Sequence, residues 1–142
     1  MPRRYITAKE KRIISARAGQ LCEYCRSRAD FAHQSFSIEH IIPVSQDGPT
    51  ELENLALACP GCNGFKSDKT TATDPTNGKN VLLYHPRQQN WNDHFEWSDD
   101  CLNIMGRIPT GRATIATLRL NRPGLVNIRL AMLALGIHPP SA

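Results

Sequence analysis

Two pairs of cysteines carry the clearest chemistry in this sequence. Cys22 and Cys25 form the first pair, and Cys59 and Cys62 the second, each with two residues between its members. Structural zinc takes four soft ligands in a tetrahedron, and a two-residue spacer lets both thiolates of a turn reach one ion. We therefore expect these four cysteines to hold a structural Zn²⁺. A redox CxxC pair is the alternative, although neither pair lies in a thioredoxin-like βαβ context. The fifth cysteine, Cys101, is expected to be a small buried apolar residue.

A second group of polar residues lies between and just after the cysteine pairs. Glu39 and His40 are adjacent, and Asn54 and Asn63 follow, the latter directly after the last paired cysteine. A neutral histidine can take a proton from water, and carboxylate and amide oxygens suit Mg²⁺ or Mn²⁺. Phosphodiester hydrolysis needs both functions. Taken singly, these residues could instead be a surface ion pair, a turn residue and a helix cap.

Three short stretches carry a resemblance to the HNH endonuclease family, which has the ββα-metal (His-Me finger) core. They are Ile38-Glu39-His40-Ile41-Ile42-Pro43, then Asn54-Leu55, then Cys59-Pro60-Gly61-Cys62-Asn63-Gly64-Phe65-Lys66, within about residues 20–70. The resemblance implies a metal-dependent endonuclease that hydrolyses DNA, with His40 as the general base. It also implies that Asn54 orients the His40 ring. Glu39 and Asn63, where the family often has Asp and His, would hold a catalytic Mg²⁺ or Mn²⁺.

The elements that must position these residues predict an α+β fold. Thr7-Ala8-Lys9-Glu10 has capping-box spacing and predicts a helix that ends near Gly19. Further along, we expect strands at 36–42 and 55–58, a short helix at 63–69, a loop at 70–80, a strand at 102–108 and helices at 111–120 and 123–135. Because side chains alternate along a strand, Glu39 and His40 should point to opposite faces unless the strand kinks or twists.

The length of 142 residues suits one domain. We expect a single domain over residues 1–142, with the HNH motif at about 20–70 and an extension at about 81–142 packed on it. Four other histidines are interpreted as packing or surface residues: His33, His85, His94 and His138.

Charge is distributed unevenly along the chain. The whole sequence has a formal charge of +4, but residues 1–28 have eight basic and two acidic side chains, whereas residues 29–54 have five acidic and no basic ones. A basic segment beside an acidic one fits a polyanion that meets a divalent cation. The candidate phosphate contacts are Arg3, Arg4, Arg12, Arg26, Arg28, Lys66 and Lys69. A second basic patch is expected from Arg112, Arg119, Arg122 and Arg129. The expected partner is DNA, double-stranded and bound with low sequence specificity.

The sequence also argues against a membrane-spanning or secreted protein. No stretch approaches the roughly 18 consecutive apolar residues of a membrane span, and no apolar signal region follows the basic N-terminus. We therefore expect a cytoplasmic protein without a membrane partner. Two alternatives to a DNA endonuclease stay open: a non-catalytic zinc-finger protein that binds nucleic acid, and an HNH nuclease that acts on RNA or within a larger complex.

Overall fold

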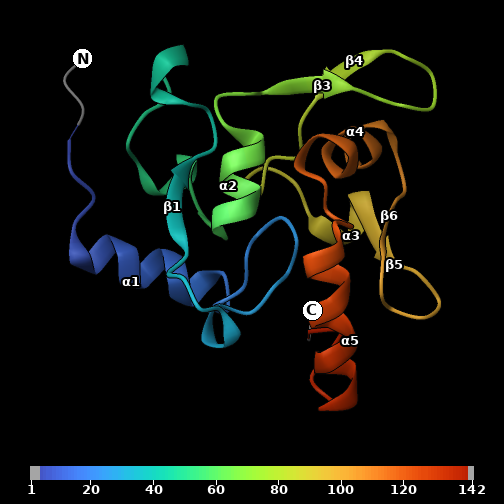
Figure 1. Ribbon diagram of the computed structural model, residues 1–142. Helices are drawn as coiled ribbons and strands as arrows, with labels where there is room; N and C mark the ends of the chain where they lie inside the picture. The colour runs from blue at the N-terminus through green and yellow to red at the C-terminus, as the bar shows by residue number, and fades with distance from the viewer. Residues whose placement is uncertain (1–3, 141–142) are drawn as a thin grey trace.

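The computed structural model describes residues 4–140 as an α+β arrangement of two neighbouring halves (Figure 1). The N-terminal half contains α1 (Ala8–Arg17), β1 (Ser37–His40), β2 (Leu55–Ala58) and α2 (Pro60–Lys66). Three short 3-10 turns accompany them at Ala29–Phe31, Val44–Gln46 and Leu52–Asn54. The C-terminal half contains β3 (Thr71–Thr73), β4 (Asn80–Leu82), α3 (Trp91–His94), β5 (Phe95–Trp97), β6 (Ile104–Gly106), α4 (Pro109–Leu118) and α5 (Pro123–Ala134).

The first helix begins as its sequence predicts. The Thr7 side chain accepts a hydrogen bond from the Glu10 backbone N–H, and the Glu10 carboxylate accepts one from the Thr7 N–H, which confirms the capping box. The buried face of α1 places Ile14 against Leu55 and Leu57 of β2. This small apolar cluster fixes α1 beside the strand pair.

The strands β1 and β2 pair antiparallel, with Glu39 opposite Ala56 and His40 opposite Leu55. All four residues of β2 are buried. The helix α2 follows at once and begins at Pro60, three residues before the predicted start at residue 63. Proline is well suited to this position because the first N–H groups of a helix have no partner within it.

The C-terminal half differs from expectation at residues 70–80. We expected a loop there, but Thr71–Thr73 pairs with Asn80–Leu82 as a hairpin. The β-branched threonines suit a strand, and Gly78, at φ +73°, donates a turn hydrogen bond to the Asp74 carbonyl. The short elements α3 and β5 were also not expected. The strand β6 and the helices α4 and α5 confirm the remaining predictions to within a few residues.

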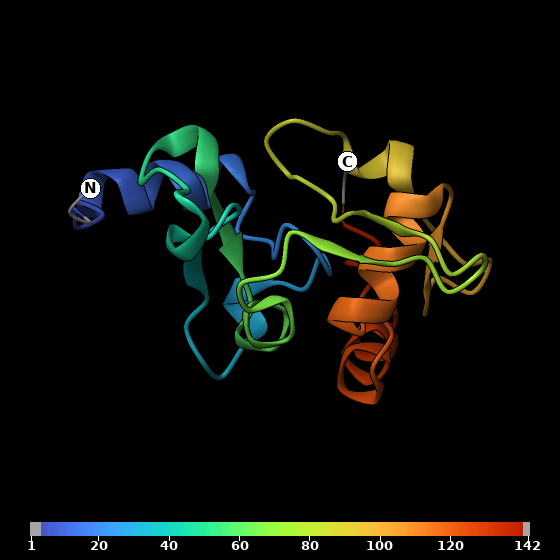
Figure 2. The same cartoon turned by 90° about the horizontal axis from the view of Figure 1, so that it is seen from above.

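Aromatic side chains join the two halves into one core. Tyr24 from the N-terminal half meets Tyr84 edge-on, and Trp91 donates its indole N–H to the Tyr24 carbonyl at 3.0 Å. An ion pair between Arg87 and the buried Glu23 adds a second connection. Viewed from above, the two halves lie side by side, with the segment before α3 arching beside their boundary (Figure 2).

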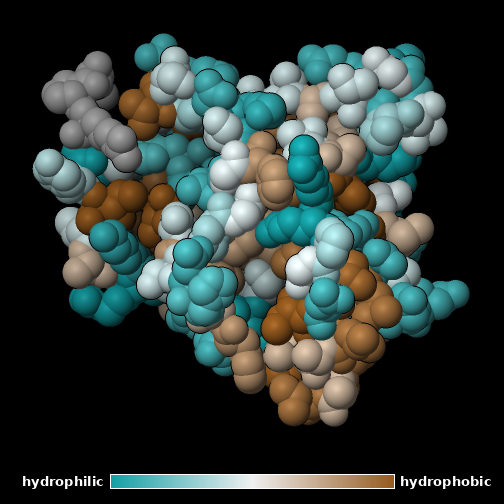
Figure 3. Space-filling view, viewed as in Figure 1, coloured by the Kyte–Doolittle hydropathy of each residue, from teal (hydrophilic) through white to brown (hydrophobic). Residues whose placement is uncertain are grey.

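The face of the molecule in Figure 3 is mostly polar, and apolar side chains gather on the lower part of α5. Leu130 and Leu135 belong to this group and are largely exposed. Within residues 4–140, no helix has both the length and the apolar character needed to cross a membrane.

Candidate metal centre and catalytic residues

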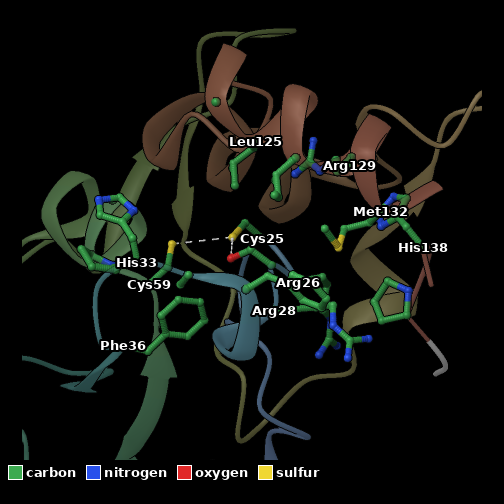
Figure 4. Close-up of a pocket in the computed structure, with 18 of the residues that line it drawn as sticks. Cys25, Arg26, Arg28, His33, Phe36, Cys59, Leu125, Arg129, Met132 and His138 are labelled. Atoms are coloured by element: carbon green, nitrogen blue, oxygen red, sulfur yellow. Dashed lines mark hydrogen bonds between the residues drawn. The ribbon is translucent and has the colours of Figure 1, made fainter. Parts of the chain in front are cut away.

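The four paired cysteines meet at one buried point. Their sulfur atoms all lie within 4.8 Å of one another, and Cys25 Sγ and Cys59 Sγ are 3.7 Å apart (Figure 4). Sulfurs bound to one zinc ion at about 2.3 Å in a tetrahedron would lie about 3.8 Å apart. The cluster is therefore arranged for a metal ion, and its four-sulfur donor set suits Zn²⁺.

A residue of the C-terminal half completes the surroundings of this cluster. The guanidinium of Arg122, which precedes α5, points N–H groups at Cys59 Sγ (3.5 Å) and Cys62 Sγ (3.7 Å). A Cβ at Gly61 would lie only 2.5 Å from this guanidinium, so the glycine between the two cysteines permits the approach. Positive charge at this distance stabilises thiolates. The sequence predicts Arg122 only as a member of a second basic patch.

His40 lies at the end of β1 and is half-buried. Its Nε2 atom is 2.8 Å from the hydroxyl of Thr50, which lies in the polar stretch between β1 and β2. This contact fixes the ring through one of its two nitrogens. The sequence does not predict this contact, because nothing in the spacing of Thr50 distinguishes it from the other polar residues of the same stretch.

Asn54 is buried and holds the segment that follows His40. Its amide accepts a hydrogen bond from the Ile42 N–H (2.9 Å) and donates to the carbonyls of Ile42 (3.0 Å) and Pro49 (2.9 Å). The expectation was that Asn54 orients the imidazole itself. In the structure these three hydrogen bonds reach the backbone that follows His40.

Glu39 faces the interior, whereas the next residue, His40, is half-buried, in line with the alternation of side chains along a strand. Only 5% of Glu39 is exposed, and its carboxylate accepts a hydrogen bond from the Tyr24 hydroxyl and pairs with Lys66 Nζ at 3.2 Å. Burial raises the pKa of Glu39, and the Lys66 ammonium and the Tyr24 hydroxyl oppose that rise.

Lys66 was expected to contact phosphate, but the structure places it in the interior. It is 1% exposed and also donates to the Ile41 carbonyl at 2.8 Å, so it cannot reach a nucleic acid from its present position. The half-buried Asn63 lies one turn earlier on the same side of α2. The oxygen donors of Glu39 and Asn63 fit Mg²⁺ or Mn²⁺ in chemical type, although Lys66 and Tyr24 already contact the carboxylate.

The other candidate phosphate contacts are dispersed. Arg3 lies outside the described residues. Arg4 pairs with Glu10 and Arg28 with Asp30, at 2.8 and 2.9 Å. Arg26 is half-buried, with its guanidinium 5.0 Å from the centre of the Trp91 ring. Arg12 and Lys69 are exposed.

The arginines of the expected second basic patch mostly make contacts within the protein. Arg112 pairs with the buried Asp74 at 2.9 Å, and Arg129 is buried, with one N–H donated to the Leu120 carbonyl. Arg119 lies over the ring of Phe65. Cys101, expected to be buried, is half-exposed in a turn at φ +62°.

Beside the metal cluster, α5 and the segment before β1 enclose a cavity of about 390 Å³ (Figure 4). Phe36, Leu125 and Met132 give it apolar walls, and the zinc-ligand candidates Cys25 and Cys59 close one side. The cluster is therefore shielded by packing from both halves of the molecule.

Part of the chain matches a known protein family. Residues 22–69 match the model of the HNH endonuclease family. The match begins at the first cysteine of the cluster and contains all four, together with Glu39, His40, Asn54 and Asn63. No curated protein matches the chain. The resemblance seen in the sequence is thus confirmed for residues 22–69, the segment called the HNH domain below.

Proposed function

We propose that this protein is a metal-dependent endonuclease that hydrolyses DNA phosphodiester bonds, with His40 as the general base. One observation carries the proposal: the HNH domain places His40 at the end of β1, where Thr50 fixes its ring. The neighbouring Glu39 faces α2, which carries Asn63. The base and the candidate metal ligands therefore belong to one compact unit.

We further propose that β1, β2 and α2 form a ββα-metal core and that the four cysteines hold a structural Zn²⁺. The antiparallel pairing of β1 with β2 and the immediate start of α2 support this. The aromatic core shared by both halves supports a single domain over residues 1–142. In this arrangement the zinc joins the turn at Cys22 to the start of α2.

In the proposed reaction, a residue of the chain itself carries out the proton transfer. His40 takes one proton from a water molecule, and the water oxygen forms a bond to phosphorus as the bond to the leaving ester oxygen breaks. Solvent returns a proton to that oxygen. General-base catalysis of this kind contributes about 10²–10⁴-fold in rate. A bound Mg²⁺ or Mn²⁺, held by Glu39 and Asn63, would neutralise charge that develops on the phosphate.

The proposed substrate is double-stranded DNA, recognised mainly through its phosphates. Residues 1–28 supply the largest excess of basic side chains in the sequence, and Arg12 and Lys69 are exposed. Phosphate contacts position a duplex but do not read bases, so low sequence specificity is expected.

The contact between Lys66 and Glu39 favours a second candidate, a non-catalytic nucleic-acid-binding protein. If Lys66 stays paired with Glu39, the carboxylate serves the fold and not a catalytic ion. Such a protein would keep the cysteine cluster and its exposed basic residues, and it would bind DNA without cutting it.

Incubation of the purified protein with supercoiled plasmid separates the two candidates. We expect nicked or linear product with Mg²⁺ or Mn²⁺, and none with EDTA at a concentration that leaves the cysteine-bound metal in place. A parallel arm with structured RNA tests the substrate. DNA binding without cleavage in any of several divalent metals would favour the non-catalytic protein.

A further inference from the structure

A second cavity, of about 320 Å³, lies between the HNH domain and the C-terminal half. One wall comes from Ile41 and Ile42, the two residues after His40, and another from α2 and the residues just beyond it, including Lys69. The third wall is the segment after β4, which contributes His85 and Gln88. The cavity therefore adjoins the strand end that carries the proposed general base.

The polar groups of this cavity favour an anion. Among the described residues that line it, none is acidic. The ammonium of Lys69 is exposed, and no carboxylate of the described residues lies within ion-pair distance of it. Lys66 lies at the inner wall, but it is paired with Glu39 and contributes little net charge.

His85 is held so that its ring presents a donor. Its Nδ1 atom accepts hydrogen bonds from the backbone N–H groups of Arg87 (3.2 Å) and Gln88 (3.3 Å). Its own backbone N–H donates to the Gln89 side chain at 3.0 Å. With Nδ1 used as an acceptor, the neutral ring carries its proton on Nε2. The two hydrogen bonds to Nδ1 thus fix this tautomer and the ring orientation, and the third holds the backbone of His85.

We propose that this cavity binds a phosphate of the nucleic-acid backbone, close to the phosphate that is cleaved, through Lys69 and the Nε2–H of His85. The inference rests on the proposed function and adds a contact from the C-terminal half to the substrate. A cavity of this volume is too small for a duplex but accommodates a phosphate and part of its sugar. Backbone phosphates accept hydrogen bonds from such side chains whatever the base sequence.

The two donors should affect binding differently. Lys69 is charged, so its loss should weaken binding and lower the slope of log affinity against log salt by about one. His85 would donate as a neutral ring, so its loss should weaken binding at every salt concentration and leave the slope unchanged.

Fluorescence anisotropy with a short labelled DNA duplex tests this, in a His40→Ala background that blocks cleavage during the measurement. Lys69→Gln and His85→Ala are compared with Lys79→Gln and His33→Ala, which change exposed residues that do not line this cavity. Circular dichroism and metal content check that each variant is folded.

We expect Lys69→Gln and His85→Ala to weaken binding by about 3–10-fold and the two controls to bind as the parent does. Affinities of all four variants equal to that of the parent would overturn the phosphate site. If the wild-type chain still cuts plasmid in that case, the proposed function stands and only this inference fails. A wild-type chain that neither binds nor cuts DNA would refute both.

Discussion

The ammonium of Lys66 lies 3.2 Å from the carboxylate of Glu39, and both side chains are almost fully buried. This pair connects α2 to β1 at the residue before His40. Lys66 also donates to the Ile41 carbonyl, so one side chain holds both the carboxylate and the backbone that follows the histidine. The stability of the HNH domain and the position of its proposed catalytic residues therefore depend on the same contact.

Lys66→Met should destabilise the protein, because it leaves the Glu39 carboxylate buried without its cation. Breaking one partner of a buried pair costs about 3–5 kcal/mol in the free energy of unfolding. Urea denaturation measures the change, and Lys69→Met, an exposed lysine three residues further on, should have almost no effect. Equal stability of the two variants would show that the buried pair contributes nothing. Adding Glu39→Gln to Lys66→Met should recover part of the loss.

Thr50→Val should slow DNA cleavage without weakening DNA binding, because it removes the hydroxyl that fixes the His40 ring. A loss of one hydrogen bond of this kind corresponds to about tenfold in kcat, with KM unchanged. Thr50→Ser, which keeps the hydroxyl, should restore most of the rate. Thr73→Val changes an exposed threonine and is the matched control. An unchanged kcat in Thr50→Val would remove Thr50 from the mechanism.

Asn54→Ala should lower the free energy of unfolding by about 1–3 kcal/mol, because it removes three hydrogen bonds from the buried Asn54 side chain to the backbone of Ile42 and Pro49. It should also slow cleavage, since the chain after His40 loses its support. Chemical denaturation and plasmid nicking report the two effects separately. Asn92→Ala, at an exposed asparagine, should change neither. Lost cleavage at full stability would instead mean that Asn54 acts directly in the reaction.

Arg122→Gln should loosen the metal centre, because it removes the cation that contacts Cys59 Sγ and Cys62 Sγ. Changes to such outer partners typically cost 10–100-fold in metal affinity. Transfer of metal to a chromophoric chelator measures the effect. Arg119→Gln is a close control, since both arginines lie over the Phe65 ring and the described contacts to sulfur come from Arg122. Equal release rates in the two variants would contradict a role for Arg122 at the metal.

Asp74→Asn should destabilise the protein at neutral pH and less so in acid. The hydrogen-bonded Arg112 guanidinium lowers the pKa of Asp74 in the folded state. The ionised group therefore stabilises the fold above its unfolded pKa of about 3.9, and this contribution is lost as the pH falls through the folded value. Urea denaturation at pH 7 and pH 3 should show the wild-type advantage shrinking. An advantage that is constant across this range would contradict the ion pair.

The features that could be predicted from the sequence are those set by short-range rules. The Thr7–Glu10 capping box depends on only four consecutive residues. The two-residue spacer within each CxxC pair is typical of zinc ligands, so the metal cluster could also be predicted. Alternation along β1 predicts that Glu39 and His40 point to opposite faces, and Glu39 is buried whereas His40 is half-buried.

The features that escaped prediction are contacts between distant or featureless segments. Arg122 reaches a cysteine 60 residues earlier, and Arg112 pairs with an aspartate 38 residues earlier. Lys66 looked like a surface cation because lysines usually are, and only the position of β1 beside α2 explains its burial. These pairings depend on the tertiary packing of segments that are distant in sequence, which no local pattern encodes.

The most direct test of the account compares wild type, His40→Ala and His33→Ala in plasmid cleavage with Mg²⁺ or Mn²⁺. His33 is an exposed histidine outside the proposed reaction and controls for loss of an imidazole. We predict that wild type and His33→Ala cut DNA. His40→Ala, folded and with its metal content intact, should be slower by about 10²-fold or more. Cleavage by His40→Ala at the wild-type rate would contradict the assignment of His40 as the general base.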